Sequence, residues 1–211
     1  MATHLAPFVR GYVPADHDAV YDVCVRTGDA GNDATGMFTH GDLIPDIWAG
    51  PYLELEPKLA FVLDDGGTAV GYVIGAADTE AFVRSYRQHW IPHLAEVYVE
   101  PSGPPADAEE TLIEFAFQPE RMMGARLDEY PAHLHIDLLP PYQGKGHGRR
   151  LIELFFESAA QAGATGVHVV VARTNTRAHG FYERVGFHVL EGPDEPGGPV
   201  FYGRRLGRTG D

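Results

Sequence analysis

Cysteine is nearly absent from the sequence. Cys24 is the only one among 211 residues, so an intramolecular disulfide and a zinc site built from several cysteines are both excluded. A lone cysteine usually packs as a small apolar side chain, and we expect this of Cys24. Stability must therefore come from a packed core, for which 211 residues with 44% apolar content are sufficient.

Long apolar runs are absent as well. No stretch approaches the roughly 20 apolar residues of a membrane span, and residues 1–16 lack the apolar run of a signal peptide. We therefore expect a cytoplasmic protein with no membrane partner. No low-complexity spacer divides the chain, which favours a single domain over residues 1–211.

Positive charge is scarce. Sixteen lysines and arginines stand against 30 acidic residues, which gives a net charge of -14. This balance opposes non-specific nucleic-acid binding, so we expect no nucleic-acid partner, and it favours a cationic amine as substrate. An acidic composition also simply keeps proteins soluble, so the charge expresses a preference and identifies no substrate.

Glycine, in contrast, is concentrated in one short loop, residues 143–148. Three glycines at alternate positions follow an apolar strand and precede an amphipathic helix. They leave backbone N–H groups accessible at a helix N-terminus, which suits a phosphate, whereas a simple helix cap needs at most one glycine. The pattern predicts an anion-binding loop made of Gln143, Gly144, Lys145, Gly146, His147 and Gly148.

Two common phosphate-binding loops do not fit this segment. A P-loop needs a glycine where Leu139 stands and a serine or threonine where Gly146 stands. A dinucleotide-binding loop needs a third glycine where Arg149 stands, and no acidic residue lies between positions 157 and 183 to bind a ribose. The remaining pattern is Gln-x-x-Gly-x-Gly.

That pattern resembles the acyl-CoA pyrophosphate loop of the GNAT superfamily of N-acetyltransferases. A second stretch, with Asn175, Ala178, Phe181-Tyr182 and Gly186-Phe187, is similar to the superfamily's Asn-x-x-Ala-x-x-Phe-Tyr-x-x-x-Gly-Phe motif. At the level of motifs the resemblance covers about residues 134–190. More loosely, the chain resembles the acetyltransferase-like domain of O-GlcNAc-removing hydrolases and its free-standing bacterial relatives, without any hydrolase domain.

The resemblance implies an α/β (α+β) fold with a mixed central sheet of about seven strands flanked by helices. It implies acetyl-CoA as cosubstrate and direct acetyl transfer to a primary amine, either a small molecule or a protein lysine. The alternative is a non-catalytic acyl-CoA-binding or interaction module with the same fold. The residues expected to bind acetyl-CoA are Leu138, Leu139, Gln143, Gly144, Lys145, Gly146, His147, Gly148, Arg149, Asn175, Ala178 and Tyr182.

Tyr182 is the candidate general acid. A phenol with a pKa near 10 is about matched to a departing thiolate, so it can transfer a proton without a large energetic mismatch. A tyrosine that only packs against the cosubstrate is the alternative reading. The donor to the developing oxyanion is expected to be a backbone N–H near Leu139, because two prolines without N–H groups follow it.

The general base is the least certain member. Strand alternation places His133, His135 and Asp137 on one face of the strand at residues 134–139. An unpaired carboxylate on a mostly apolar strand is costly to bury, so Asp137 ranks first and His135 second. Asp137 holding a neighbouring group is the structural alternative, and Glu96 or Glu129 could serve if the preceding segment folds over the site.

The same three residues raise the question of a metal site. Two imidazoles and one carboxylate resemble a facial ligand set. Side chains two apart on a strand start about 7 Å from each other and rarely converge on one ion. We therefore expect no metal.

The rest of the chain is read from apolar periodicity and turn residues. Residues 77–132 form an insertion before the central strand, either a lid over the acceptor side or a dimer surface, so a homodimer stays open. Strands are expected at residues 8–12, 59–63, 70–76, 95–99, 134–139, 167–172, 188–191 and 199–204. Helices are expected at residues 16–27, 43–48 and 82–90, and a further helix follows the glycine loop and ends near residue 163. Residues 112–117 are expected to be a strand or the start of a helix.

Overall fold

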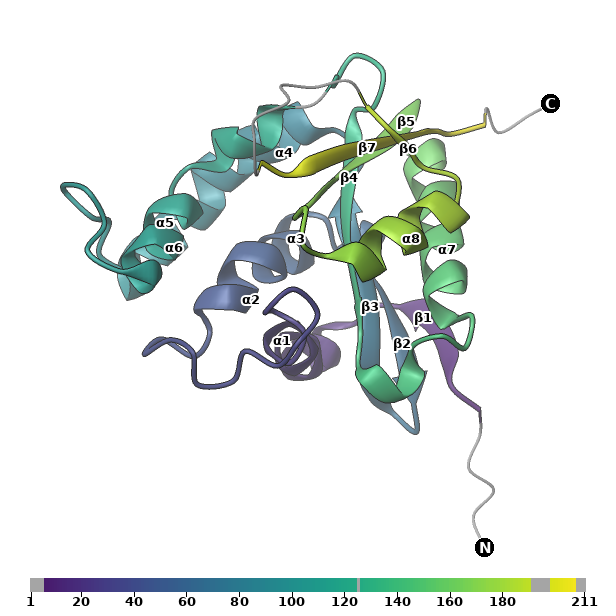
Figure 1. The fold of residues 1–211 in the computed structure, drawn as a ribbon, viewed down its shortest axis with the longest axis horizontal. Helices are drawn as coiled ribbons and strands as arrows, with labels where there is room; N and C mark the ends of the chain where they lie inside the picture. Colours follow the sequence, from purple (N-terminus) through teal and green to yellow (C-terminus); the bar gives the residue numbers. More distant parts are fainter. Residues whose placement is uncertain (1–5, 125, 191–197, 208–211) are drawn as a thin grey trace, which may run out of the picture.

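The computed structural model describes residues 6–124, 126–190 and 198–207. Its centre is a seven-stranded mixed sheet in the order β1-β2-β3-β4-β5-β7-β6 (Figure 1). This confirms the predicted α/β class and the predicted number of strands. The strands are β1 (Phe8–Gly11), β2 (Phe61–Asp65), β3 (Thr68–Ala76), β4 (Ala132–Leu138), β5 (Gly166–Val171), β6 (His188–Val189) and β7 (Val200–Arg205).

Helices cover both faces of the sheet. On one face lie α1 (His17–Val25), α2 (Leu43–Trp48) and α3 (Gly50–Leu55), and on the other lies α7 (His147–Gln161) (Figure 1). The last helix, α8 (Thr176–Arg184), lies beside α7 at the side of β4 that faces β5. Val20, Val23 and Cys24 of α1 are buried, as the periodicity predicted. None of the helices in the described ranges is long and apolar enough to cross a membrane.

The segment between β3 and β4 is helical. It contains α4 (Thr79–Ser85), a π-helical turn (Tyr86–Trp90), α5 (Ile91–Val97), α6 (Ala108–Ala116) and a 3-10 turn (Pro119–Gly124). The strand expected at residues 95–99 is therefore wrong, and residues 112–117 fall in a helix. Asp78 and Asp107 cap α4 and α6, because their side chains accept the N–H groups of Ala81 and Glu110.

The β2–β3 hairpin turns at two glycines, between the strands expected at residues 59–63 and 70–76. Gly66 and Gly67 have φ angles of 67° and 92°, which L-residues rarely adopt. The Gly67 N–H donates to Asp64 Oδ1 over 2.7 Å. Further along β3, a Cβ on Gly75 would come within 2.1 Å of the His133 carbonyl oxygen, so only glycine permits this close approach to β4.

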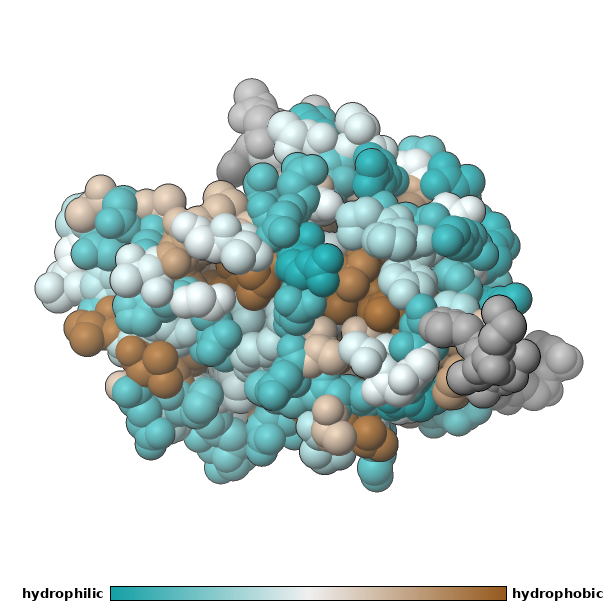
Figure 2. Space-filling view, turned by 90° about the horizontal axis from the view of Figure 1, so that it is seen from below, coloured by the Kyte–Doolittle hydropathy of each residue, from teal (hydrophilic) through white to brown (hydrophobic). Residues whose placement is uncertain are grey.

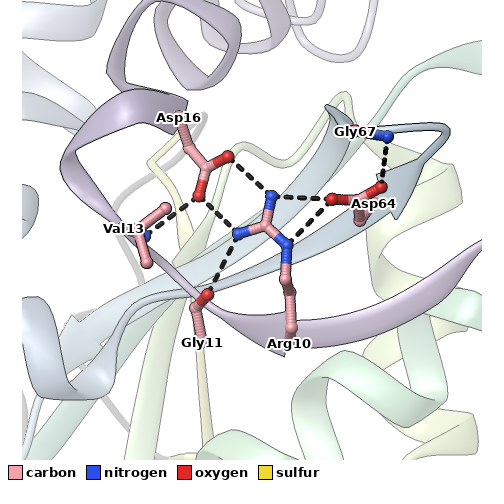
Figure 3. Close-up of polar contacts among 6 residues, drawn as sticks. All are labelled: Arg10, Gly11, Val13, Asp16, Asp64 and Gly67. Carbon is pink, nitrogen blue, oxygen red and sulfur yellow. Dashed lines mark hydrogen bonds and ion pairs between the residues drawn. The ribbon is translucent and has the colours of Figure 1, made fainter.

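Arg10 ties the first strand to the hairpin (Figure 3). Its guanidinium donates to both carboxylate oxygens of Asp16, over 2.6 and 2.7 Å, and Nε donates to Asp64 Oδ2 over 2.8 Å. Asp16 and Asp64 are almost fully buried. The hydrogen bonds from Arg10 hold the pKa of Asp16 below its usual range. One cation thus compensates two buried carboxylates.

The sheet opens between β4 and β5. β4 pairs with β3 without interruption from His133 to Leu138. With β5 it forms a parallel pair only at Ala132–Val167 and His133–His168, and the described residues show no further pairing between these two strands. Beyond His133, β4 and β5 therefore leave an opening between them, called the wedge below. The backbone groups of β4 that face this wedge have no partner strand, and the candidate site lies there.

Candidate active site

The predicted anion-binding loop has the required backbone geometry. Gly144 and Gly146 have φ angles of 71° and 85°. Gly146 is the N-cap of α7, a helix of 15 residues, so the loop lies at the positive end of its dipole. Residues with a side chain rarely adopt such φ angles, and this explains the glycines at both positions.

A cavity of about 360 Å³ lies between this loop, β4 and α8. Its size is within the range of small-molecule sites. Its apolar walls are Ile136, Leu138 and Phe181, and hydrophobic residues framed by hydrophilic ones are visible near the middle of the face seen from below (Figure 2). The expected cosubstrate residues that line it are Leu138, Gln143, Gly144, Gly146, Gly148, Arg149, Asn175, Ala178 and Tyr182.

Three of the expected cosubstrate residues do not line the cavity: Leu139, Lys145 and His147. Lys145 is exposed to solvent. The Nδ1 of His147 is buried and has no hydrogen-bond partner within the described chain. The loop thus offers its backbone rather than these side chains to the cavity.

Leu139 is corrected in a second respect. Its N–H donates to the Val70 carbonyl over 3.0 Å, so it is unavailable to an oxyanion. Neighbouring residues of a strand direct their backbone groups to opposite sides. The Leu138 N–H therefore points toward the wedge, and Leu138, one residue earlier than expected, is the candidate donor.

The side chain of Gln143 spans part of the cavity. Its Nε2 donates to the Leu138 carbonyl over 2.7 Å, and its Oε1 accepts from Arg177 Nη1 over 2.7 Å. Asn175 caps α8, because its Oδ1 accepts the Ala178 N–H over 3.1 Å. These contacts fix both sides of the wedge relative to each other.

Asp137 is the one acidic side chain among the described residues that line the cavity. It is half-buried, and its Oδ2 accepts a hydrogen bond from the Tyr72 hydroxyl over 2.8 Å. Burial raises the pKa of Asp137 to about 7, and the hydrogen bond from Tyr72 opposes this rise. A carboxylate that titrates near neutral pH is suited to act as a general base.

Tyr182 lies on α8 with its ring against Phe181 and Phe187. Only 8% of the residue is exposed, although it lines the cavity. Burial raises its pKa above the ordinary value of a phenol, and the nearby Asp137 adds to this. Tyr182 is therefore protonated at neutral pH, as a general acid must be.

His135 is directed away from the cavity into a buried chain of hydrogen bonds. Thr79 donates to the Pro131 carbonyl, so it accepts from His133 Nδ1 over 2.7 Å. His133 Nε2 must then accept from Tyr52, 2.9 Å away, and Tyr52 in turn accepts from His135 Nε2 over 3.1 Å. Burial lowers the pKa of His135 to about 4. Its Nε2 is a donor here and His135 does not line the cavity, so this geometry does not favour His135 as a second base, and its ranking stays a prediction.

The remaining alternatives for the base also lie elsewhere. Glu129 forms ion pairs with Arg126 and Arg205, and neither it nor Glu96 lines the cavity. His133 and His135 are both committed to Tyr52. Within the described residues, no group of three or more His, Cys, Asp or Glu side chains is arranged to hold a metal ion.

Two lining arginines were not foreseen from the sequence, whereas the family resemblance implies pocket residues from positions 28–57. Arg177 and Arg184 add positive charge beside Arg149. Ala30 and Gly31 close the cavity from the α1–α2 connection, in a tight turn where Asp29 and Asn32 pair. Ala30 has a φ of 49°, uncommon for a residue with a side chain. The glycines at 28 and 31 signalled a turn there, but nothing local signalled its contact with residues a hundred positions later.

Comparisons with known proteins agree with this geometry. The acetyltransferase (GNAT) family profile matches residues 109–187. The crystal structure of SsHAT is 45% identical, has a TM-score of 0.91, and the match covers 97% of this chain and 100% of that one. The chain belongs to the GNAT acetyltransferase family.

The chain is also similar to more distant proteins. Protein O-GlcNAcase from Rattus norvegicus and from Mus musculus is 27% identical over 203 residues. The match covers 94% of this chain and 22% of each of those proteins, so the chain spans about a fifth of their length. PaiA N-acetyltransferase from Thermoplasma acidophilum, solved in complex with coenzyme A, is 14% identical with a TM-score of 0.56 over 95% of this chain and 99% of that one, which shows the shared fold alone.

Proposed function

We propose that this protein is an acetyl-CoA-dependent N-acetyltransferase that moves an acetyl group directly to a primary amine. The observation that carries the proposal is a single cavity lined by a carboxylate, a protonated phenol and a glycine loop at a helix N-terminus, namely Asp137, Tyr182 and residues 143–148. Family membership makes acetyl transfer the expected chemistry.

The cosubstrate fits the residues present. The positive φ angles of Gly144 and Gly146 and the dipole of α7 suit the pyrophosphate. Arg149, Arg177 and Arg184 supply further positive charge at the cavity wall. The unpaired backbone of β4 can pair with the amides of an extended pantetheine arm, as it would with an added strand.

The residues divide the chemistry among them. Acetyl-CoA, when bound, supplies the thioester carbonyl and the thiolate leaving group. Asp137 accepts a proton from the acceptor ammonium, directly or through water, and leaves a neutral amine that can attack the carbonyl carbon. The Leu138 N–H stabilises the negative charge that develops on the carbonyl oxygen. The new C–N bond forms first, and Tyr182 then gives its proton to the sulfur as the C–S bond breaks. The second proton of the acylated nitrogen passes to the Tyr182 phenolate, directly or through water, and restores the phenol.

The acceptor is a primary amine of a small molecule or a protein lysine. The net charge of -14 favours a cation. Similarity to part of the O-GlcNAcases makes a protein lysine one option. A cytoplasmic location, a homodimer and the role of residues 77–132 as an insertion within one domain remain predictions.

The test is a calorimetric titration with acetyl-CoA, with free CoA and a dinucleotide as controls, followed by an amine screen that detects released thiol. Micromolar affinity, about -8 kcal/mol, together with amine-dependent thiol release supports the proposal. Binding without release for any amine would favour the non-catalytic acyl-CoA-binding module instead. Absence of binding would refute both.

A further inference from the structure

A buried tyrosine lies behind the candidate base. Tyr72, on β3, is directly opposite Asp137 in the β3–β4 register and is 0% exposed. Its hydroxyl donates to Asp137 Oδ2 over 2.8 Å. Tyr72 does not line the cavity, so any effect on the reaction must pass through Asp137.

The Tyr72 hydroxyl is itself held in place. The thiol of Cys24, on α1, lies beside it, and burial raises the pKa of this thiol to about 12, so the thiol keeps its proton. Thr27, also on α1, donates its proton to the Val23 carbonyl over 2.7 Å. Thr27 also lowers the pKa of Asp137, but less than Tyr72, whose hydroxyl donates to Asp137 Oδ2. Cys24, Tyr72 and Asp137 form a polar chain from α1 through the core to the cavity.

We infer that Tyr72 is a positioning residue for the reaction, which fixes the Asp137 carboxylate at the cavity wall and favours its ionised form. The inference rests on the proposed function. A hydrogen bond to a carboxylate stabilises the anion relative to the acid. Burial raises the pKa of Asp137, and the hydrogen bond from Tyr72 opposes this rise.

The other groups around Asp137 leave this role to Tyr72. The titratable neighbours from the packed elements are the Cys24 thiol of α1 and the Tyr182 phenol of α8, both neutral at pH 7. Asp46 of α2 raises the pKa of Cys24 and is not among the groups that shift the pKa of Asp137. Burial leaves His135, on the same strand, uncharged at neutral pH. No cation among the described residues contributes to the pKa of Asp137.

The test is the substitution Tyr72→Phe, which removes the hydroxyl alone. Carbon-13 NMR of the carboxyl group, assigned with Asp137→Asn, measures the titration midpoint of Asp137 without any turnover. We expect the midpoint to rise by about one pH unit. The pH midpoint on the acid side of the kcat/KM profile should rise by the same amount. The rate below pH 7 then falls about tenfold, while the high-pH plateau and the KM for acetyl-CoA are retained.

Tyr86→Phe is the matched control. Tyr86 is also buried, and its hydroxyl donates to the Ala116 carbonyl over 2.9 Å, away from Asp137. This variant should lose a similar amount of stability with no change in the Asp137 midpoint. A folded Tyr72→Phe protein with an unchanged midpoint overturns the inference, even if its melting temperature falls.

A second variant covers the case in which Tyr72→Phe does not fold. Cys24→Ala keeps the phenol and removes its neighbour, so we expect a smaller upward shift of the midpoint, about half a unit. No shift there would equally overturn the inference. If the wild-type protein transfers acetyl to no amine, the proposed function fails, while the carboxyl titration still decides whether Tyr72 sets the ionisation of Asp137.

Discussion

Arg177 donates from Nη1 to Gln143 Oε1 over 2.7 Å and so joins α8 to the glycine loop across the cavity. The other end of the same amide donates to the Leu138 carbonyl. That carbonyl belongs to the unpaired edge of β4 with which a pantetheine amide would pair. Gln143 thus occupies an acceptor that the cosubstrate needs.

Removal of the Gln143 side-chain amide should favour the binding of cosubstrate fragments that interact only with the backbone edge of β4. We expect Gln143→Ala to bind acetyl-pantetheine, which lacks the nucleotide, a few-fold more tightly than the wild type, because one competing hydrogen bond is worth about 1 kcal/mol. Calorimetry measures the difference, with Gln161→Ala at the exposed end of α7 as control. Weaker binding by Gln143→Ala would contradict the competition.

Substitution of Tyr182 by Phe should slow the reaction and leave cosubstrate affinity nearly unchanged. The ring and its packing against Phe181 and Phe187 are retained, and only the proton for the thiolate is lost. A loss of about 10²-fold in kcat is expected for general acid catalysis. Steady-state kinetics and calorimetry separate the two quantities. A fully active variant would remove Tyr182 from the acid role.

Substitution of Asp137 by Asn should lower kcat/KM by about 10²- to 10⁴-fold, because the amide cannot accept the proton. Its carbonyl oxygen can still accept from Tyr72, so the fold should be preserved. In the wild type the base must be ionised, so the acid side of the pH–rate profile should have its midpoint at the Asp137 pKa of about 7. Activity should fall with each unit of pH below 7. A flat profile between pH 5 and 8 would argue against Asp137 as the base.

Substitution of Gly146 by Val should abolish acetyl-CoA binding. The φ of 85° is strained for any side chain, and a β-branched one is the worst case. Gly103→Val is the control, since Gly103 is exposed, has no positive φ and has open space around it. Calorimetry on both folded variants gives the answer, and undiminished binding by Gly146→Val would refute the role of the loop.

Substitution of Arg10 by Ala should destabilise the fold by about 3 kcal/mol, because two buried carboxylates lose their cation. Urea unfolding at pH 7 measures this. Asp16 has a lowered pKa in the folded state, so its contribution is present above the unfolded value near 4 and is lost as the pH falls through the folded value. The difference between variant and wild type should therefore shrink in acid.

Arg26→Ala provides the comparison for Arg10. Arg26 pairs with Asp22 on the exposed surface of α1 over 3.1 Å. Such a pair contributes less than about 0.5 kcal/mol. Equal losses for the two variants would mean that burial of Asp16 and Asp64 does not amplify the role of Arg10.

Much of the sheet could be predicted because its signals are local. The alternation of residues around Asp137 predicts a strand by itself. The glycines at 66 and 67 predict a turn by themselves. The helix α3 was missed because it begins with Gly50 and Pro51, residues that usually interrupt helices. Proline is tolerated in the first turn, and a Cβ on Gly50 would come within 2.3 Å of the Tyr21 hydroxyl, so tertiary packing selected these residues.

The parts of the site that escaped prediction depend on distant contacts. Sequence spacing placed His135 and Asp137 on one face, but Tyr52 of α3 determines where the imidazole is held. The Leu139 N–H appeared suitable until its pairing with Val70 was known. Ala30 reaches the cavity only because α1 packs on β3. Local periodicity carries no information about such contacts.

The incomplete pairing of β4 with β5 also bears on how the protein avoids association with itself. A free strand edge on the outside of a sheet invites pairing with other chains. Here the open edge of β4 lies inside the fold, beneath α8 and the glycine loop, which line the same cavity. The cavity at this edge has a volume of about 360 Å³, in the range of small-molecule sites. The unpaired backbone groups of β4 are thus accessible to a ligand, while their position inside the fold protects them from pairing with other chains.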